Sequence, residues 1–456
     1  MKQFEFTTEI PVSRDVDVLV VGGGPAGIAA AVAAGRTGAV TMLVENNGYL
    51  GGMATAGLVG PFMTSYSPDA SRQITKGIFE EFVNRMVNKG GAIHPSQCQP
   101  GTSYSSYIGR GHAHVGPFDS EIFKLEAEAM CIEAGVELLY HAMFVKTIMN
   151  EDNSRITGAI FATKAGLMMI TAKIFIDCTG DGDVAASSRV EMKQGREQDG
   201  LTQPCTLFFQ VFNIDKQKLE EHRKNHPEPD GKQFSTEVEL ARANGDFPIN
   251  REKLGMYESC TNGYWRVNTT RITNVDATDP FEVTKAEIEG RKQVQIVMNF
   301  LHKYIPGAEQ ACLADSAPQL GVRESRRIVG EYILEADDLN NSRIFEDSIG
   351  LGGFAIDIHQ PDGKSGRFEL IKSGKAYSIP YRSLLPKSVN NLLVAGRCIS
   401  ATHEALGAVR VMPPCFVTGE AAGTAAAIAV KEDISPKQVE YAKLRQVLIA
   451  NNVMVD

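Results

Sequence analysis

The sequence contains no pair of neighbouring cysteines. Its eight cysteines stand apart, at positions 98, 131, 178, 205, 260, 312, 398 and 415, and none forms a C-x-x-C motif. An enzyme that passes electrons to a disulfide needs two neighbouring thiols, so their absence argues against a disulfide reductase. We expect reduced and mostly buried thiols instead.

Long apolar runs and an excess of positive charge are absent as well. No stretch approaches the roughly 18 uninterrupted apolar residues of a membrane span, and the start, MKQFEFTTEIPVSRD, lacks the apolar core of a secretory signal. The formal net charge of −9 argues against a nucleic acid or an anionic membrane as the main partner. We therefore predict a cytoplasmic location.

Apolar residues make up 43% of the chain and charged residues 22%, as in an ordinary globular protein. A length of 456 residues is too great for one compact core. We expect two domains, or one domain with a large insertion.

The most informative stretch is residues 16–45, VDVLVVGGGPAGIAAAVAAGRTGAVTMLVE. Its Val-rich start is typical of a buried parallel strand. Gly22, Gly24 and Gly27 then stand in G-x-G-x-x-G register, which permits a tight turn, a close approach of pyrophosphate and close helix–strand packing. Pro25 suits the first turn of the following helix.

That helix, residues 26–36, consists mainly of small residues, and Gly38 is placed to end it. Residues 40–44 predict a second strand. Glu45 follows about 20 residues after Gly24, the interval at which an acid binds the adenosine ribose and disfavours a 2′-phosphate. The unit predicts a dinucleotide site, but it does not distinguish FAD from NAD.

Two further stretches continue this predicted site. Asn46 and the loop NNGYLGGMATAG follow Glu45, and the paired glycines of this loop offer a second place where backbone can approach a ligand. Residues 142–163 and 167–178 predict an antiparallel meander, with Val145 in its first strand. The last strand runs into the turn TGDGD at residues 179–183, where ligands of parallel sheets bind.

Residues 90–117 predict an irregular loop that faces the substrate. It contains Arg110 and an H-x-H pair, His112 and His114, which could offer two ligands to a metal. No carboxylate or cysteine stands at a convincing spacing, so we predict no metal.

The character of the chain changes near residue 201, where charge rises. We assign residues 204–377 to an inserted substrate or cap domain, with a long helix at 281–304, and residues 1–203 and 378–456 to a discontinuous nucleotide-binding domain. Residues 350–355 resemble a second dinucleotide motif, but the following IDIHQP cannot form the required helix. We therefore expect a single nucleotide unit.

The C-terminal part begins with a buried strand that ends at Gly396, followed by a predicted loop at 400–411. Pro413-Pro414 then opens a helix at 415–430, in which small residues leave one face nearly bare. Such a face allows very close packing on a sheet or on a flat ring.

The motifs GGGPAG, LGGMAT, FIDCTGDGDVA, LGVRESRRIVGEY, YSIPYRSLLP and NLLVAGRCISATHEALGAVRVMPPCFVTGEAAGTAAA together resemble the bacterial FAD-dependent oxidoreductase family of glutathione-reductase-like fold. The resemblance covers most of the chain and implies bound FAD. It implies an α/β fold: an FAD-binding Rossmann-like three-layer domain with a β-meander, plus an inserted α+β cap domain. Wider relatives place Gly-Asp after the C-terminal strand, where this chain has Gly396-Arg397.

The resemblance and the motifs give one set of cofactor-binding candidates: Gly22, Gly24, Pro25, Ala26, Gly27, Glu45, Asn46, Gly51, Gly52, Met53, Ala54, Thr55, Val145, Thr179, Gly180, Asp181, Gly396, Arg397, Arg410 and Pro413. The amino end of the helix after Pro413 would direct its partial positive charge at the flavin ring.

We predict hydride transfer between a small organic substrate and N5 of the flavin, with the protein supplying orientation and proton transfer. His359 or His403 is the candidate acid–base residue, because histidine titrates near neutral pH. Arg323 and Arg410 are candidates for binding a substrate carboxylate or carbonyl. Each of these residues also has a purely structural interpretation. An FAD protein that acts on tRNA and a non-catalytic flavin-binding protein remain alternatives, and the electron acceptor and oligomeric state are not predicted.

Overall fold

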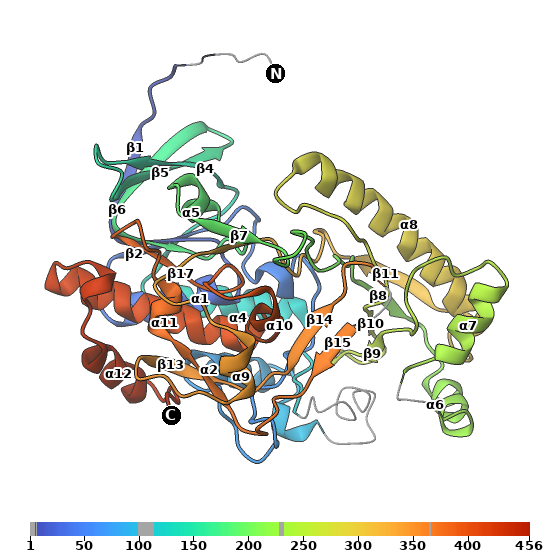
Figure 1. The fold of residues 1–456 in the computed structure, drawn as a ribbon. Coiled ribbons are helices and arrows are strands. Elements are labelled where there is room, and N and C mark those ends of the chain that lie inside the picture. The colour runs from blue at the N-terminus through green and yellow to red at the C-terminus, as the bar shows by residue number, and fades with distance from the viewer. Residues whose placement is uncertain (1–4, 6, 99–113, 228–231, 364–365) are drawn as a thin grey trace.

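A computed structural model describes residues 5, 7–98, 114–227, 232–363 and 366–456, and it shows a mixed α/β fold (Figure 1). Arg110 and His112 of the predicted H-x-H segment lie outside the described residues.

The largest sheet has seven strands in the order β3-β2-β1-β6-β5-β4, with β17 also paired to β6. The strands are β1 (Val12–Val21), β2 (Thr41–Val44), β3 (Glu137–Leu139), β4 (Met143–Met149), β5 (Ile156–Thr163), β6 (Gly166–Asp177) and β17 (Leu392–Val394). The first three strands, β6 and β17 pair in parallel, whereas β4, β5 and the start of β6 form the predicted antiparallel meander.

The second half of strand β1, from Val16 to Val21, is buried on both faces, as its Val-rich sequence predicts. Val18 and Val20 pack in the hydrophobic cluster that contains the helix α1 (Pro25–Arg36). Leu19 and Val21 point the other way, into a cluster with Phe161 of the meander. The alternation of side chains along the strand therefore builds three layers: helices, parallel sheet and meander.

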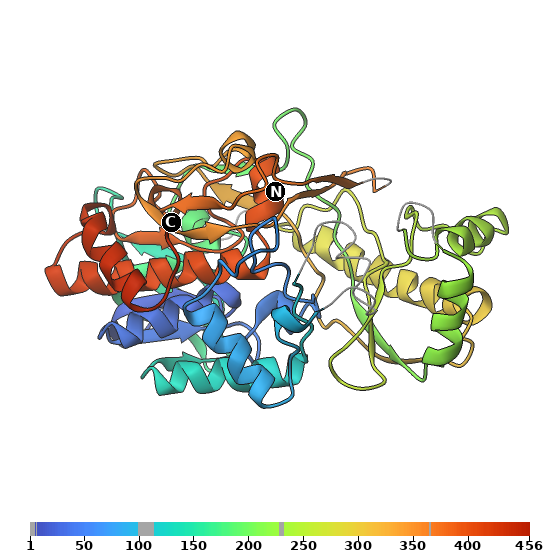
Figure 2. The ribbon, with the colours of Figure 1, turned by 90° about the horizontal axis from the view of Figure 1, so that it is seen from below.

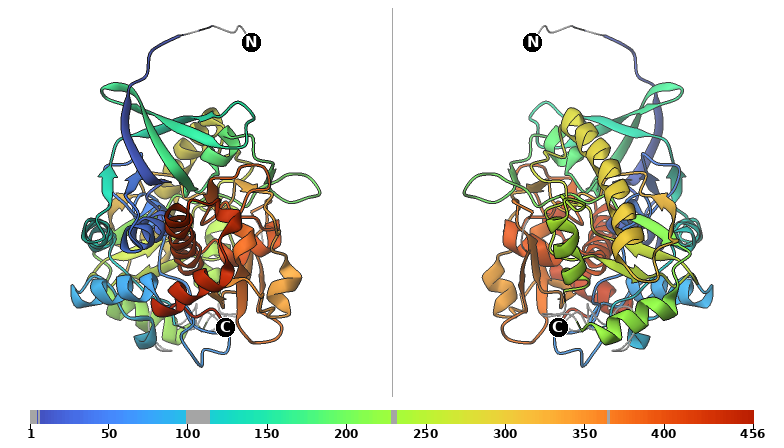
Figure 3. Two further views of the ribbon diagram at one scale, coloured as in Figure 1. Left: turned by 90° about the vertical axis from the view of Figure 1, so that its left-hand side faces the viewer. Right: turned by 90° about the vertical axis from the view of Figure 1, so that its right-hand side faces the viewer.

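Helices α4 (Ser120–Glu133), α1 and α11 (Met412–Glu432) lie side by side in one layer, and Figure 3 shows them nearly end-on. Asp119 caps α4 by accepting hydrogen bonds from the backbone N–H groups of Glu121 and Ile122. Helix α2 (Ile78–Asn88) contacts all three of these helices.

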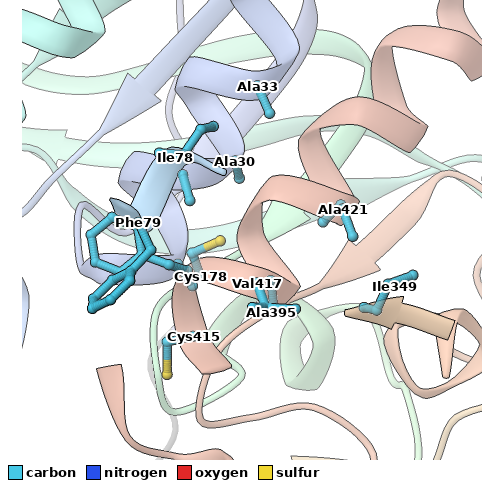
Figure 4. Packing of buried hydrophobic residues seen from close by; sticks show 14 of the residues in the cluster. Ala30, Ala33, Ile78, Phe79, Cys178, Ile349, Ala395, Cys415, Val417 and Ala421 are labelled. Atoms are coloured by element: carbon cyan, nitrogen blue, oxygen red, sulfur yellow. The ribbon is translucent and has the colours of Figure 1, made fainter. Parts of the chain in front are cut away.

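The bare face of α11 packs on another helix, rather than on a sheet or a flat ring as predicted. A Cβ at Gly419 would lie 2.1 Å from the Ala26 carbonyl oxygen, and one at Gly423 would lie 2.0 Å from that of Ala30. Figure 4 shows Ala30 and Ala33 on α1 beside α11, and Val417 and Ala421 on the side of α11 that faces Ile349. The small residues are needed because the two backbones touch.

A second region of the chain has its own sheet and its own hydrophobic cluster (Figures 1 and 2). Its strands are ordered β11-β8-β10-β9, and its helices lie outside them. The elements are β8 (Phe209–Phe212), α6 (Lys216–Asn225), α7 (Ser235–Ala243), β9 (Met256–Glu258), β10 (Trp265–Val267), α8 (Pro280–Tyr304) and β11 (Cys312–Ser316). The long helix predicted at 281–304 is confirmed.

The assignment of residues 204–377 to a cap domain remains a prediction. The two main hydrophobic clusters change over near residue 320 rather than near residue 377. Buried residues of the second cluster run from Cys205 to Leu320, apart from Leu58. Leu334, Ile349 and Ile371 belong to the first cluster instead. The segment after Leu320 therefore packs with the large sheet and its helices.

The remaining elements are short, and most of them belong to this returning segment. They are β7 (Met192–Gln194) with its partner β12 (Arg326–Ile328), α9 (Ala336–Asn340), β13 (Ser348–Gly352) with β16 (Tyr377–Pro380), β14 (Ile356–His359) with β15 (Gly366–Glu369), α10 (His403–Val409) and α12 (Tyr441–Ala450), together with α5 (Asp183–Ser187) and short turns of 3₁₀ helix at Gly52–Ala54, Pro95–Gln97, Tyr381–Leu384 and Pro436–Gln438.

Two stretches of this segment differ from a dinucleotide unit and from a loop, respectively. Strands β13 and β14 occupy the stretch that resembles a second dinucleotide motif, so its rejection is confirmed. The loop predicted at 400–411 is wrong, because α10 occupies most of it. Thr402 caps this helix by accepting a hydrogen bond from the N–H of Ala405. Four of its seven residues are buried Ala, Gly or Leu, so the helix packs closely against the core.

Candidate active site

A cavity of about 1040 Å³ lies between the nucleotide-type motif and the second region. Its lining includes Gly22 and Glu45 from the first βαβ unit, Arg271 from the second region, and Asp357 and His359 from β14. In Figure 1, β14 and β15 lie between the large sheet with its helices and the region of α6 to α8.

The glycines of the motif take the positions that their spacing predicts. Gly22 has φ +100°, and a Cβ there would lie 2.5 Å from the Cys178 carbonyl oxygen. A Cβ at Gly27 would lie 1.8 Å from the Gly22 oxygen, so Gly27 allows the helix to meet the strand. A Cβ at Gly24 would meet no atom within 4 Å and Gly24 lines the cavity, so the backbone is open there to a ligand.

The amino end of α1 borders the same space. Gly24 is its N-cap and Pro25 its first residue, and no side chain caps the helix. The unpaired N–H groups and the partial positive charge of a helix amino end suit a pyrophosphate. Because this opening needs an anion and has room for one, the first βαβ unit fits a dinucleotide.

Glu45 is buried at the carboxyl end of β2 and lines the cavity. Its Oε2 accepts a hydrogen bond of 2.7 Å from the Gly23 N–H, and its Oε1 accepts 2.8 Å bonds from the N–H and side-chain amide of Asn47. These bonds fix the carboxylate at the position from which an acid reaches the adenosine ribose.

Arg397 lies where wider relatives have aspartate, and it clamps the turn after β6. Its Nη2 donates to Asp181 Oδ1 at 2.5 Å, its Nε donates to the Gly180 carbonyl at 2.9 Å, and its Nη1 donates to the Val322 carbonyl. Gly180 in this clamp has φ +81°, a left-handed conformation that favours glycine. The clamp joins the large sheet to the segment that leads from the second region.

The amino end of α11 also faces the cavity. Val411 is its N-cap without a side-chain cap, and Val411, Met412 and Cys415 line the space. The helix begins at Met412, so Pro413 and Pro414 lie in its first turn, where a missing N–H costs nothing. The predicted positive end of this helix is therefore directed into the cavity.

Fourteen of the twenty cofactor-binding candidates line the cavity, and the structure places the others behind it. Gly51 supports the wall by donating its N–H to the Gly23 carbonyl, and Thr55 donates its hydroxyl to the Leu50 carbonyl. Val145 is 47% exposed and points away, while Met143 and Phe144 line the cavity in its place. The remaining candidates outside the lining are Gly27, Ala54 and Pro413.

The far end of the cavity is rich in arginine. Arg323 is buried and its Nη1 donates to the Pro204 carbonyl and to Thr206 Oγ1, both at 2.6 Å. Arg410, at the end of α10, donates from Nη2 to the Asp357 carbonyl at 3.1 Å. Both predicted arginines therefore line one wall.

His359 lies beside these arginines on β14. Ile356 and Ile358 point into the core, so Asp357 and His359 point to the opposite face, towards the cavity. Burial and then the charges of Arg323 and Arg271 lower the pKa of His359 well below its ordinary value of 6.5. His359 is therefore neutral at pH 7 in the absence of a bound anion.

The structure does not bring His403 to the cavity. His403 is 5% exposed in the first turn of α10, and its Nδ1 lies 2.8 Å from Oε1 of the buried Glu324. Glu324 Oε1 also accepts from Arg327, and its Oε2 accepts from the Gln203 N–H at 3.1 Å. We therefore assign His403 to an internal polar network rather than to acid–base chemistry.

Sequence reasoning missed several residues of the arginine-rich end. Arg251 and Arg271 line it from the second region, and Asp357 lines it from β14. Oε1 of the buried Gln203 accepts a hydrogen bond from the backbone N–H of His359 at 3.2 Å. The same oxygen lies 3.4 Å from Arg410 Nη2. The spacing of Asp357 to His359 on one strand was a usable signal, whereas nothing in the sequence relates positions 203, 251 and 271 to it.

All eight cysteines are free and six are buried, in agreement with the expectation of reduced thiols. Across the described ranges, no group of three or more His, Cys, Asp or Glu side chains could hold a metal ion. Within the same ranges, no helix has both the length and the apolar character needed to cross a membrane.

The chain matches several solved structures at low sequence identity. A geranylgeranyl bacteriochlorophyll reductase-like protein from Thermoplasma acidophilum is 13% identical over 97% of this chain and 84% of its own, with a TM-score of 0.43. The p-nitrophenol 4-monooxygenase from Pseudomonas putida is also 13% identical, over 97% of this chain and 88% of its own, with a TM-score of 0.45. At this level of similarity they carry no information on the reaction.

The search of curated proteins gives no match. The family comparison is decisive, because the model for FAD dependent oxidoreductase matches residues 17–448, which include both the nucleotide motif and the arginine-rich end of the cavity. The cofactor is therefore FAD, which the open backbone at Gly24 and the two uncapped helix amino ends fit, and this protein is an enzyme of the FAD-dependent oxidoreductase family.

Proposed function

We propose that the enzyme transfers a hydride between a small organic substrate and FAD. The observation that carries the proposal is that one cavity has both kinds of lining: the motif that suits the dinucleotide and, in continuity with it, the wall with Arg323, Arg410 and His359. A substrate bound at that wall would lie in the same chamber as the cofactor, without a second nucleotide unit between them.

FAD supplies the redox chemistry, because its ring accepts or donates a hydride. The protein's own residues have three tasks. Arg323 and Arg410 bind and orient an oxygen-rich group of the substrate through planar, charged donors. His359 receives or returns the substrate proton, since it is neutral at pH 7 and lies on the same wall. The amino end of α11 adds partial positive charge to the chamber.

The proposed proton step depends on charge. Burial and then the arginines lower the pKa of His359 in the ligand-free cavity, so it is neutral and ready to accept a proton but binds one weakly. A bound anion would offset the arginine charges and raise the pKa of His359 towards neutrality. Proton acceptance would then be favoured only when the substrate is present.

The test begins with the visible absorption spectrum of the purified protein, followed by anaerobic titration with hydroxy acids, unsaturated acids, sugars and NAD(P)H. Bleaching of the oxidised flavin by one organic compound, and not by NAD(P)H, would support the proposal and begin to identify the substrate. Re-oxidation by the matching acceptor would test the reverse direction. The R323M variant, with an unchanged flavin spectrum, should bleach at least tenfold more slowly.

A yellow protein that no compound bleaches would contradict hydride transfer from a substrate and favour a non-catalytic flavin-binding role. A yellow protein that binds tRNA, in spite of its own net negative charge, would favour the tRNA alternative. A surface variant, Arg291→Gln in the exposed pair with Glu287, serves as the control and should bleach at the wild-type rate.

A further inference from the structure

We infer that the substrate is an organic acid with two carboxylate groups, and that Arg271 with Arg323 and Arg410 binds them. This inference rests on the proposed function, in that the ligand of this wall is the molecule that exchanges the hydride. Arg271 is the new residue, because it comes from the second region of the chain, four residues after β10.

Several buried donors of the wall lack a hydrogen-bond partner in the described part of the chain. Among the described residues, the buried atoms without a hydrogen-bond partner include Arg271 Nε and Nη1, Arg410 Nε and Gln203 Nε2. All four atoms are donors, and Gln203 Oε1 already accepts from the His359 N–H, which fixes the amide orientation. Buried donors are ordinarily satisfied, so this wall calls for a ligand that supplies several acceptors.

Positive charge also exceeds negative charge at this wall. Two cations elsewhere in the lining pair with acids: Arg397 with Asp181 at 2.5 Å and Lys232 with Glu252 at 2.7 Å. Asp357 lines the arginine wall, and its Oδ2 lies 3.8 Å from Arg410 Nη2. Among the described lining residues, Arg271, Arg323 and Arg410 thus share the carboxylate of Asp357, with Arg251 beside them, which leaves an excess of about two positive charges for a ligand.

Mutual repulsion among the arginines agrees with this count. Burial and then Arg410 and Arg251 lower the pKa of Arg323 to about 9. Burial and then Arg251 and Arg323 lower the pKa of Arg271 well below its ordinary value, although Asp357 and Asp362 oppose the shift. A dianion would relieve this repulsion, whereas a neutral substrate would leave it.

Arg323 lies within electrostatic range of both other arginines, because its charge acts on Arg271 and the charge of Arg410 acts on it. Arg410 is held from α10 beside Asp357, whereas Arg271 belongs to the second region. We assign one carboxylate to Arg323 and Arg410 and the other to Arg271 and Arg323. Guanidinium groups suit planar carboxylates because they donate two parallel hydrogen bonds.

The test measures binding to the oxidised holoenzyme by titration calorimetry, and by the perturbation of the flavin absorption spectrum, without turnover. The probes are succinate, glutarate and citrate, with butyrate as a monocarboxylate and inorganic phosphate as a different anion. We expect at least one of the di- or tricarboxylates to bind at least tenfold more tightly than butyrate and phosphate. Equal affinities for that acid and butyrate would overturn the inference, and so would tightest binding of phosphate, which would indicate a phosphate ester.

The variant Arg271→Gln should weaken binding of the preferred acid at least tenfold and binding of butyrate less than threefold. Arg271→Lys, which keeps the charge but loses the planar fork, should lie between the two. Arg291→Gln is the matched surface control and should bind like wild type. If Arg271→Gln fails to retain FAD, the comparison of probes on the wild-type enzyme still decides the inference.

The two proposals fail in different ways. Bleaching of the flavin by a neutral alcohol or sugar would keep hydride transfer and overturn the dicarboxylate. Arg271-dependent binding of a dicarboxylate, with no compound that bleaches the flavin, would keep the anion site and overturn hydride transfer.

Discussion

Gly419 of α11 faces the backbone of Ala26 in α1 so closely that a Cβ at Gly419 would lie 2.1 Å from the Ala26 carbonyl oxygen. Ala26 also lines the cavity, in the first turn of α1 and within the glycine motif. Helix α11 therefore supports the nucleotide-binding turn from behind, and its small residues serve this contact.

Gly419→Ala should destabilise the protein and weaken FAD binding together, because a backbone oxygen cannot move aside as a side chain can. We expect a loss of about 1–3 kcal/mol in the free energy of unfolding, measured by thermal or denaturant unfolding alongside flavin content. Gly290→Ala in α8 is the control, since its Cβ would meet the Leu207 side chain at 2.9 Å. An FAD content as high as that of wild type, with the stability loss expected, would contradict the supporting role.

Arg397→Lys should weaken FAD binding, since lysine cannot donate at once to Asp181, the Gly180 carbonyl and the Val322 carbonyl. We expect about a tenfold rise in the FAD dissociation constant, which corresponds to about 1.4 kcal/mol, measured by flavin fluorescence on reconstitution of the apoprotein. Arg382→Lys, at an exposed pair with Asp347, should leave the constant unchanged. Equal constants for both variants would show that the clamp does not act on the cofactor.

His403→Ala should lower stability without changing how flavin reduction depends on pH. Its loss leaves the buried Glu324 with one partner fewer, at a cost of about 1–3 kcal/mol. His403→Asn keeps a donor near the position of Nδ1 and should retain most of that stability. Loss of one limb of the pH–rate profile in both variants would assign His403 to proton transfer after all.

Glu420→Gln should change how stability depends on pH. Burial raises the pKa of Glu420 to about 8, from an ordinary value of 4.5, although its Oε2 accepts from the Ile78 N–H at 2.9 Å. Because the folded protein holds this proton more tightly than the unfolded chain, the contribution is full below pH 4.5 and declines as pH rises to about 8.

The glutamine variant should remove that decline and be the more stable protein above pH 8. The slope removed is at most about 1.4 kcal/mol per pH unit, and unfolding midpoints from pH 5 to pH 9 measure it. Parallel curves for the two proteins would contradict a protonated Glu420. Glu432→Gln, at the exposed end of α11, is the control.

Local sequence rules explain the parts of the site whose groups are near one another in the chain. Gly22, Gly24 and Gly27 lie on one strand–turn–helix unit. Backbone geometry and close packing require their spacing, so this spacing can be recognised in the sequence. The meander, the long helix α8 and the capping of α4 by Asp119 follow from periodicity and turn residues in the same way. The prediction that Val145 binds the cofactor was wrong by one or two residues along its strand, since Met143 and Phe144 line the cavity instead. The alternation of side chains decides which of them face the cavity.

The sequence by itself determined the nucleotide unit, the α/β class and, through its set of motifs, the family. Only the tertiary structure decided that α11 packs on α1, that α10 is a helix which buries His403, and that Arg271, Arg323 and Arg410 share one wall. The physical reason is distance along the chain. Glycine spacing and strand alternation are imposed by neighbouring residues, whereas a wall built from positions 203 to 410 exists only after the large sheet and the second region have packed together.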